Sequence, residues 1–284
     1  MPQKLSITAY STALFSTWVF VEELGLLFDC GDGLTSSLLQ KTRKIQHAFI
    51  SHADRDHLTG LFQFNQLNGR DGLTISYPKD AGSFPAIADF TAKFDPHISG
   101  TSWNAIEPGD GVALQNNYHV TAIANGHVES DQTKSLSYVL SHEKRKLKAQ
   151  FTSLQGSEIA SKRAEFGDNA LFDAVVDKEL IYSGDTPVEF DGRYSGTRIL
   201  IHESTFLSRE ELGEGTHDRN LHSSLDAVME MVAETELQHL ILGHFSSRYA
   251  DAQIDEAVAK EASRCGVNIP ISIIYPGRVA RFQI

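Results

Sequence analysis

The sequence has few cysteines, no long apolar run and no excess of basic residues. Its 284 residues include only two cysteines, Cys30 and Cys265, and neither belongs to a C-x-x-C pair. Disulfide scaffolds and thiolate zinc sites are therefore not expected. No segment approaches the roughly 18 consecutive apolar residues of a membrane-spanning helix, and residues 1–6 lead into no signal-peptide core. We therefore expect a cytoplasmic protein that does not enter the membrane.

The net charge of −12 is unfavourable for nucleic-acid binding, because phosphate contacts normally draw on an excess of lysine and arginine. Bound divalent cations or a local basic cluster could still supply positive charge. The most polar stretch, residues 141–168, is a candidate for such a cluster. We interpret it as a solvated helix and loop, with a basic edge that contacts substrate phosphates as the alternative. Its basic residues are Lys144, Arg145, Lys146, Lys148, Lys162 and Arg163.

The composition, 41% apolar and 22% charged, is typical of a globular protein, and the length suits one large domain spanning residues 1–284. Two segments, 225–232 and 254–262, have helical spacing of apolar residues, the first behind the candidate caps Ser223 and Ser224. The first third of the sequence is rich in hairpin patterns, and the last third is rich in strand–helix–strand patterns. Together they predict an α/β fold with two facing mixed β-sheets flanked by helices. The predicted strands are 18–21, 25–28, 45–50, 118–123, 136–140, 180–182, 199–201, 240–242 and 271–275.

The clearest functional signal is the segment Ser51–His57, directly after the apolar run 45–50. His52, Asp54, Asp56 and His57 place two imidazoles and two carboxylates within six positions. A strand followed by a tight loop holds side chains two apart on the same side, so these groups can converge. Imidazole nitrogen suits zinc, and carboxylates hold a second cation close by. A solvated polar loop is the alternative, but the density of ligands predicts a metal site.

Three further candidate ligands follow strand-like runs. Each stands directly after a glycine, in the pairs Gly126-His127, Gly184-Asp185 and Gly243-His244. Glycine lets the backbone turn sharply and present the next side chain at the sheet edge. Each pair alone is a weak signal, because a lone histidine after a strand is more often structural.

In this order the ligands resemble those of the metallo-β-lactamase superfamily, where an H-x-H-x-D-H loop is completed by a later His, an Asp and a final His. The segment Phe28-Asp29-Cys30-Gly31-Asp32-Gly33 resembles its strand-ending Asp-x-Gly turn, in which Asp29 would orient ligands or simply form the turn. Within the superfamily the chain most resembles the ribonuclease Z family of tRNA 3′-end processing endonucleases. The matching motifs are 50–61, Tyr77-Pro78-Lys79, 182–186, 202–206, His222-Ser223-Ser224 and 243–249.

This resemblance implies an αββα four-layer sandwich, a homodimer and a binuclear centre with two divalent ions, normally zinc. One ion would be held by His52 and His127 and the other by Asp56, His57 and His244, with Asp185 bridging. Paired ions activate a water molecule for in-line attack on a phosphodiester.

The resemblance also implies roles beyond the ligands. Asp56 would position the attacking group, and His222 with Glu203 would protonate the departing 3′ oxygen. Arg248, Ser246 and Ser247 would hold phosphate. The alternatives are structural: a bridging Glu203, a His222 that only precedes a helix, and a surface Arg248.

The chain departs from the family at two places. Asp54 replaces the second histidine of the loop, which adds charge and shifts preference from zinc toward manganese or iron. A carboxylate there also resembles the H-x-E-x-D-H loop of flavodiiron proteins, although no flavin-binding domain is present. The segment from Ser141 to Tyr182 lacks the Gly/Pro-rich basic signature of the bacterial tRNA-binding arm, so we expect that arm to be missing.

We therefore predict a binuclear metal-dependent hydrolase with a ribonuclease Z-like phosphodiesterase site, whose substrate is RNA, as in tRNA 3′-end processing, or a small nucleotide. The alternative is a small-molecule hydrolase of the same fold, either a cyclic nucleotide phosphodiesterase or a lactonase or esterase. A di-iron redox protein and a non-catalytic nucleic-acid-binding module are less favoured, because the late His-Glu and His-Ser-Ser motifs suit hydrolysis and the ligand set is intact.

Overall fold

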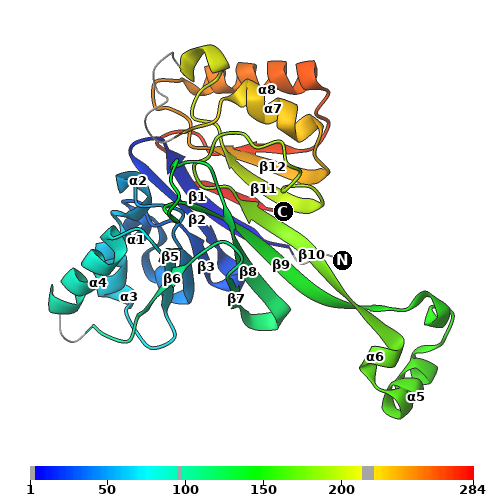
Figure 1. Cartoon of the computed structure of the whole chain (residues 1–284). Coiled ribbons are helices and arrows are strands. Elements are labelled where there is room, and N and C mark those ends of the chain that lie inside the picture. Colours follow the sequence, from blue (N-terminus) through cyan, green and yellow to red (C-terminus); the bar gives the residue numbers. More distant parts are fainter. Residues whose placement is uncertain (1–3, 95–97, 213–220) are drawn as a thin grey trace.

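The computed structural model describes residues 4–94, 98–212 and 221–284. Within these ranges the strands form two mixed seven-stranded sheets that face each other (Figure 1). The first sheet has the order β14 (Ala280–Gln283), β1 (Ser6–Thr12), β2 (Ser16–Val21), β3 (Leu26–Phe28), β4 (His47–Phe49), β5 (Thr74–Pro78) and β6 (Ser102–Ile106). The second has the order β13 (Ile271–Ile273), β12 (Leu237–Gly243), β11 (Thr197–Glu203), β10 (Phe172–Tyr182), β9 (Leu136–Leu147), β8 (Tyr118–Ala124) and β7 (Gly111–Ala113).

The central strands are apolar on both faces because both faces are covered. In β2, Val19 and Val21 point into the core between the sheets, whereas Trp18 and Phe20 point outward. Since side chains alternate along a strand, a strand buried on both sides appears in the sequence as a continuous apolar run. This is why the runs 18–21, 25–28 and 199–201 predicted strands correctly.

Helices cover the outer face of each sheet, which completes four layers (Figure 1). The helices α1 (Leu34–Leu38), α2 (Arg55–Leu58), α3 (Leu61–Asn68) and α4 (Ser83–Phe94) belong to the first half of the chain, and α7 (Leu225–Ala233) and α8 (Asp251–Cys265) to the second. Separate outer cores lie under each set, with Phe64 and Phe84 in one and Val228 and Ile254 in the other. The predicted αββα sandwich is confirmed.

An arm extends from the second sheet, where the sequence predicts a solvated helix and loop. Beyond their buried halves, β9 and β10 continue as an exposed antiparallel ribbon paired as far as Leu147 and Phe172. Helices α5 (Gly156–Phe166) and α6 (Asp168–Leu171) lie at its tip, well away from the body (Figure 1). The expectation of a missing arm is therefore wrong: an arm is present without the Gly/Pro-rich signature.

Both sheets present the carboxyl ends of parallel strands at one edge. Strands β3 to β6 run parallel in the first sheet, and β10 to β13 run parallel in the second. Loops that leave such ends are the usual place for a binding site in α/β folds. No helix among the described residues is long and apolar enough to cross a membrane. That residues 1–284 form a single domain stays a prediction.

Candidate metal centre

The candidate ligands lie on loops at this edge, and both sheets contribute. His52 follows β4, and Asp56 and His57 lie in the first turn of α2. His127, Asp185 and His244 follow β8, β10 and β12 of the second sheet. Gly184 has a φ of +61°, and a Cβ there would lie 2.8 Å from Cβ of Ser51, so the turn before Asp185 requires glycine.

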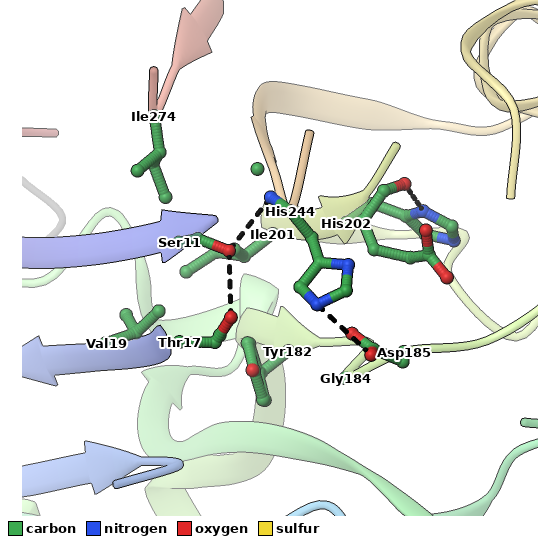
Figure 2. Close-up of a pocket in the computed structure, with 12 residues that line it drawn as sticks. Ser11, Thr17, Val19, Tyr182, Gly184, Asp185, Ile201, His202, His244 and Ile274 are labelled. Atoms are coloured by element: carbon green, nitrogen blue, oxygen red, sulfur yellow. Dashed lines mark hydrogen bonds and ion pairs between the residues drawn. The ribbon is translucent and has the colours of Figure 1, made fainter. Parts of the chain in front are cut away.

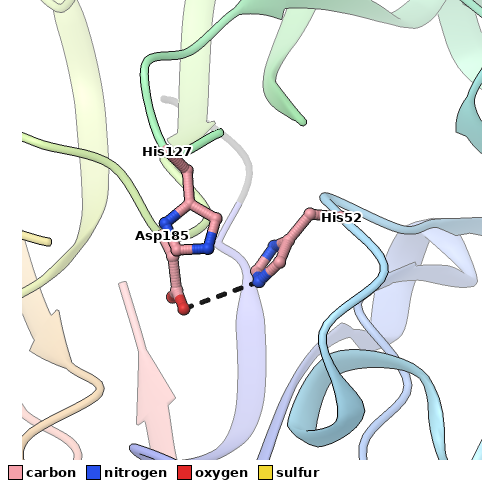
Figure 3. A group of neighbouring side chains, drawn as sticks. All are labelled: His52, His127 and Asp185. Carbon is pink, nitrogen blue, oxygen red and sulfur yellow. Dashed lines mark ion pairs between the residues drawn. The ribbon is translucent and has the colours of Figure 1, made fainter. Parts of the chain in front are cut away.

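Among the described residues, three overlapping groups of three possible ligands lie at this edge. The third joins His222 to Asp185 and His244, and the other two hold the predicted ligands. Of these two, one consists of His52, His127 and Asp185 (Figure 3), and the other of Asp56, His57 and His244. Within each group the ligand atoms lie within 4.8 Å of one another.

Asp185 lies between the two groups. Its Oδ2 atom is 3.2 Å from Nε2 of both His57 and His244 and 3.6 Å from Nε2 of His52. A single carboxylate thus reaches both groups.

Each of the four imidazoles is held through Nδ1, which turns Nε2 toward the centre. Nδ1 of His52 donates to the Ser51 hydroxyl (2.9 Å), and Nδ1 of His57 donates to Asp29 (2.7 Å). The other two partners are the Leu221 carbonyl for His127 (2.8 Å) and the Thr205 hydroxyl for His244 (2.8 Å). A second partner that fixes the tautomer of an imidazole is typical of metal ligands.

Two of the buried groups have the charge state that suits cation binding. Burial and the neighbouring His57 lower the pKa of His52 well below its usual value, so this imidazole is neutral, the form that binds metals. Burial raises the pKa of Asp185, but His244, His57 and His52 outweigh burial and hold it well below its usual value. Asp185 is therefore an ionised carboxylate at neutral pH.

The residues present fit a metal. Nε2 of His52 is buried and makes no hydrogen bond within the part of the chain that the structure describes. An orphaned polar atom in a protein interior is costly unless a ligand satisfies it. Its direction toward Asp185 makes a bound cation the natural partner (Figure 3).

Asp54 is the N-cap of α2 and faces the first group. Its Oδ2 atom lies 3.7 Å from Nε2 of His52 and 3.4 Å from Nε2 of His127. With Asp54 included, the first group has two imidazoles, one carboxylate of its own and the shared Asp185. The second group has the same composition, with Asp56 as its own carboxylate.

A cavity of about 310 Å³ opens beside these ligands. Asp54, Asp56, Asp185 and His244 lie on its wall. Of the residues predicted to hold phosphate, Ser246 and Arg248 line the cavity, whereas Ser247 is exposed and does not. The Arg248 guanidinium already pairs with Glu211 and the Tyr249 hydroxyl.

His222 also lines the cavity, and Glu203 lies behind it. Nδ1 of His222 is 2.9 Å from Oε1 of the buried Glu203. Burial lowers the pKa of His222, but the Glu203 carboxylate outweighs burial and raises it to about 9. His222 is therefore an imidazolium at neutral pH, held at the cavity wall.

Proteins named tRNase Z and ribonuclease Z are similar in sequence to this chain. The chain is 27% identical over 280 residues to the chloroplastic tRNase Z TRZ2 of Arabidopsis thaliana, covering 94% of this chain and 75% of that protein. It is 28% identical over 276 residues to the ribonuclease Z of Methanosarcina acetivorans, covering 87% of this chain and 86% of that protein. No family model matches.

Solved structures show the same architecture. The metallo-β-lactamase fold protein YhfI from Bacillus subtilis superimposes with a TM-score of 0.64 and 16% identity, over 98% of this chain and 99% of that one. The short form of human tRNase Z superimposes with a TM-score of 0.60 and 17% identity, over 97% and 98% of the two chains. The chain is similar in sequence to ribonuclease Z proteins and has the metallo-β-lactamase fold.

Several residues that support the candidate metal centre carry no clear signal in the sequence. The Thr205 hydroxyl donates to Glu203 (2.7 Å) and contacts both His222 and His244. The Asn125 side chain donates to the carbonyls of Ser183 (3.2 Å) and Asp185 (3.1 Å) and so joins two ligand loops. Thr205 lies in a motif that the resemblance singled out; Asn125 precedes the Gly126-His127 pair.

Ser11, in β1 of the first sheet, holds the loop that carries His244. The backbone N–H of His244, which has a φ of +59°, donates to the Ser11 hydroxyl (2.8 Å), and Ser11 contacts Thr17 (3.2 Å). Figure 2 shows Ser11 between these two groups, with the His244 ring turned toward Asp185. The strained backbone of His244 is thus stabilised by a hydroxyl 233 residues away in the sequence.

Proposed function

We propose that the chain is a metal-dependent phosphodiesterase that processes the 3′ ends of precursor tRNA. The observation that carries this proposal is the pair of ligand groups that share Asp185 beside an open cavity. Its relatives named tRNase Z and ribonuclease Z support RNA as the substrate.

Two divalent cations would be held by His52, Asp54 and His127 on one side and Asp56, His57 and His244 on the other, with Asp185 shared. When bound, such a pair activates water and offsets negative charge on a phosphodiester. The other chemical roles belong to residues of the cavity wall. His222, protonated by virtue of Glu203, donates its proton to the departing oxygen, which would otherwise leave as an alkoxide.

Roles for the other predicted residues follow from their positions. Asp56, whose Oδ2 lies 3.3 Å from Nε2 of His244, orients the attacking water as well as binding a cation. Ser246 and Arg248, which line the cavity, contact the phosphate, Arg248 by exchanging part of its pairing with Glu211. Ser247 is exposed and does not line the cavity. It would contact only parts of a substrate that extend beyond the cavity.

We propose zinc as the resident metal, with a tolerance for manganese or iron that Asp54 provides. A carboxylate in place of an imidazole favours harder cations. Asp54→His should therefore raise the affinity for zinc relative to manganese, and Asp54→Asn should weaken the first site for both. Competition between the two metals, followed by elemental analysis of the protein, measures this; an unchanged zinc-to-manganese ratio in Asp54→His would contradict a ligand role.

The second candidate function is hydrolysis of a small nucleotide or ester. The net charge of −12 favours it, because RNA is repelled by a negatively charged protein. Hydrolysis of precursor tRNA and of bis(p-nitrophenyl) phosphate, each with zinc, manganese and iron, separates the two. Cleavage of the precursor at its 3′ trailer supports the first proposal. Robust lactone or ester turnover without phosphodiester turnover would overturn it.

We also propose that the chain forms a homodimer in the cytoplasm. An exposed aromatic cluster on α3 and α4 supports self-association: Phe90 and Phe94 are 57% and 62% exposed and pack against Phe62. Light scattering should give the mass of two chains, and Phe90→Ser with Phe94→Ser should give the mass of one. A wild-type monomer would contradict the proposal.

A further inference from the structure

A strained leucine lies at the edge of the cavity. Among the described residues, left-handed backbone at non-glycine positions occurs at Asp29, His244 and Leu14 near the site. It also occurs at Leu39, Asn116 and Asn117 elsewhere. Asp29 and His244 both serve the candidate metal centre, and asparagine tolerates this conformation. A bulky side chain there is rare, and strain of this kind concentrates at functional sites.

Leu14 is not held in this conformation by core packing. It lies in the turn between β1 and β2, and it is 70% exposed. Instead, its backbone is tied to the metal loop: its N–H donates to Asp56 (2.9 Å), and its carbonyl accepts from Arg55 (3.0 Å). The turn thus holds the leucine side chain at the cavity.

The cavity has both acidic and apolar residues on its wall. Asp54, Asp56 and Asp185 are the acidic residues, and they belong to the candidate metal centre. Ala13, Leu14 and Phe206 supply apolar surface on the same cavity. The Arg248 guanidinium lies over the Phe206 ring at 5.4 Å from its centre, which fixes the ring at this position.

We propose that Leu14 and Phe206 bind the nucleobase next to the phosphodiester that the metals hold; this rests on the proposed function. A phosphodiester held by the metals beside this cavity places one of its substituents in it. Bases have planar, weakly hydrated faces that pack on aromatic and apolar side chains regardless of sequence. The substrate class is therefore a nucleotide diester in which at least one side carries a base.

The test compares Leu14→Gly with the matched control Leu39→Gly. Leu39 has the same side chain, the same 70% exposure and a left-handed φ, but it lies after α1 and does not line the cavity. The substrates are the 5′ and 3′ thymidine p-nitrophenyl phosphate diesters, with methyl p-nitrophenyl phosphate as the diester without a base. A second variant is Leu14→Asn. Because asparagine tolerates the left-handed backbone, this variant removes the apolar contact without loosening the turn.

Both Leu14 variants should lower kcat/KM about five-fold or more for at least one thymidine diester. They should leave kcat/KM for the methyl diester and the metal content unchanged, and Leu39→Gly should change none of these. Unchanged kcat/KM for both thymidine diesters, or a loss in Leu14→Gly that Leu14→Asn does not share, would overturn the proposal. Failure of the wild-type protein to hydrolyse both precursor tRNA and these three diesters would instead overturn the proposed function.

Discussion

Glu203 lies behind His222, which lines the cavity, and both of its carboxylate oxygens accept hydrogen bonds. Its oxygens accept from the backbone N–H groups of Thr186 (3.1 Å) and Thr205 (3.1 Å), from the Thr205 hydroxyl and from His222. A carboxylate with these partners is fixed in place, so it acts on a substrate only through His222. In the proposed mechanism Glu203 is therefore a positioning residue, and His222 is the proton donor.

Replacing His222 by alanine should separate catalysis from metal binding. Loss of a positioned proton donor typically costs 10²- to 10⁴-fold in rate, and we expect kcat for RNA to fall within about this range. His222 also lies near Asp185 and His244, so the metal content of the variant decides its role. Loss of a metal ion together with activity would make His222 a ligand instead.

Replacing Glu203 by glutamine should move the pH dependence. A histidine whose pKa is raised donates its proton below that pKa, and its activity is lost as the pH rises through it. Without the carboxylate the pKa of His222 falls toward its usual 6.5, so the alkaline limb of kcat/KM should move to lower pH. Glu179→Gln, at a buried carboxylate paired with Lys144 and Arg198, is the control. An alkaline limb at the same pH in Glu203→Gln and wild type would contradict the assignment.

At the scale of elements, the arm is balanced in charge. Lys144 pairs with Asp177 and Glu179, and both Arg145 and Arg163 pair with Asp168. The tip of the arm lies well away from the body of the molecule (Figure 1). Only a large substrate could therefore contact both the tip and the candidate metal centre. The arm therefore bears on the choice between RNA and a small nucleotide.

Shortening the arm should affect RNA alone. Replacing residues 148–171 by a short glycine-rich turn keeps the β9–β10 pairing up to Leu147 and Phe172. We expect kcat/KM for precursor tRNA to fall about ten-fold or more, because contacts outside the cavity are lost. Hydrolysis of bis(p-nitrophenyl) phosphate should stay the same. Equal effects on both substrates would mean that the deletion disturbs the fold, and no effect on either would exclude the arm from RNA binding.

Buried strands and amphipathic helices were predictable from the sequence, but exposed and short elements were not. The runs that form β2, β3 and β11 are apolar because both faces are covered. In contrast, β6 is mostly exposed, and β1 is rich in serine and threonine, so neither strand appears in the sequence as an apolar run. The strands of the arm were not predicted because many of their side chains are charged and exposed to solvent, so they form no apolar run.

At the candidate site, the sequence predicted residue types with strong chemical identity. His52, His57 and Asp185 stand out because imidazoles and carboxylates cluster after apolar strands. Ser11 and Asn125 do not, because a hydroxyl or amide becomes a support only when the fold brings a distant backbone group to it. Leu14 stands out only through its backbone angle, which no sequence pattern reveals.

At the scale of the whole molecule, the candidate centre joins the two halves of the chain. The ligands His52, Asp54, Asp56 and His57 come from the first half of the chain, and His127, Asp185 and His244 follow strands of the second sheet. A cation bound by both groups would link the sheets across their shared edge, so binding energy would add to the stability of the fold.

The central claim is that two ligand groups sharing Asp185 hold two divalent cations. The most direct measurement is the number of metal ions per chain, determined by elemental analysis after reconstitution with zinc and removal of unbound metal. We expect two ions per chain in the wild-type protein and fewer than two in Asp185→Asn, because both groups lose their shared carboxylate. One ion or none in the folded wild-type protein would contradict the claim.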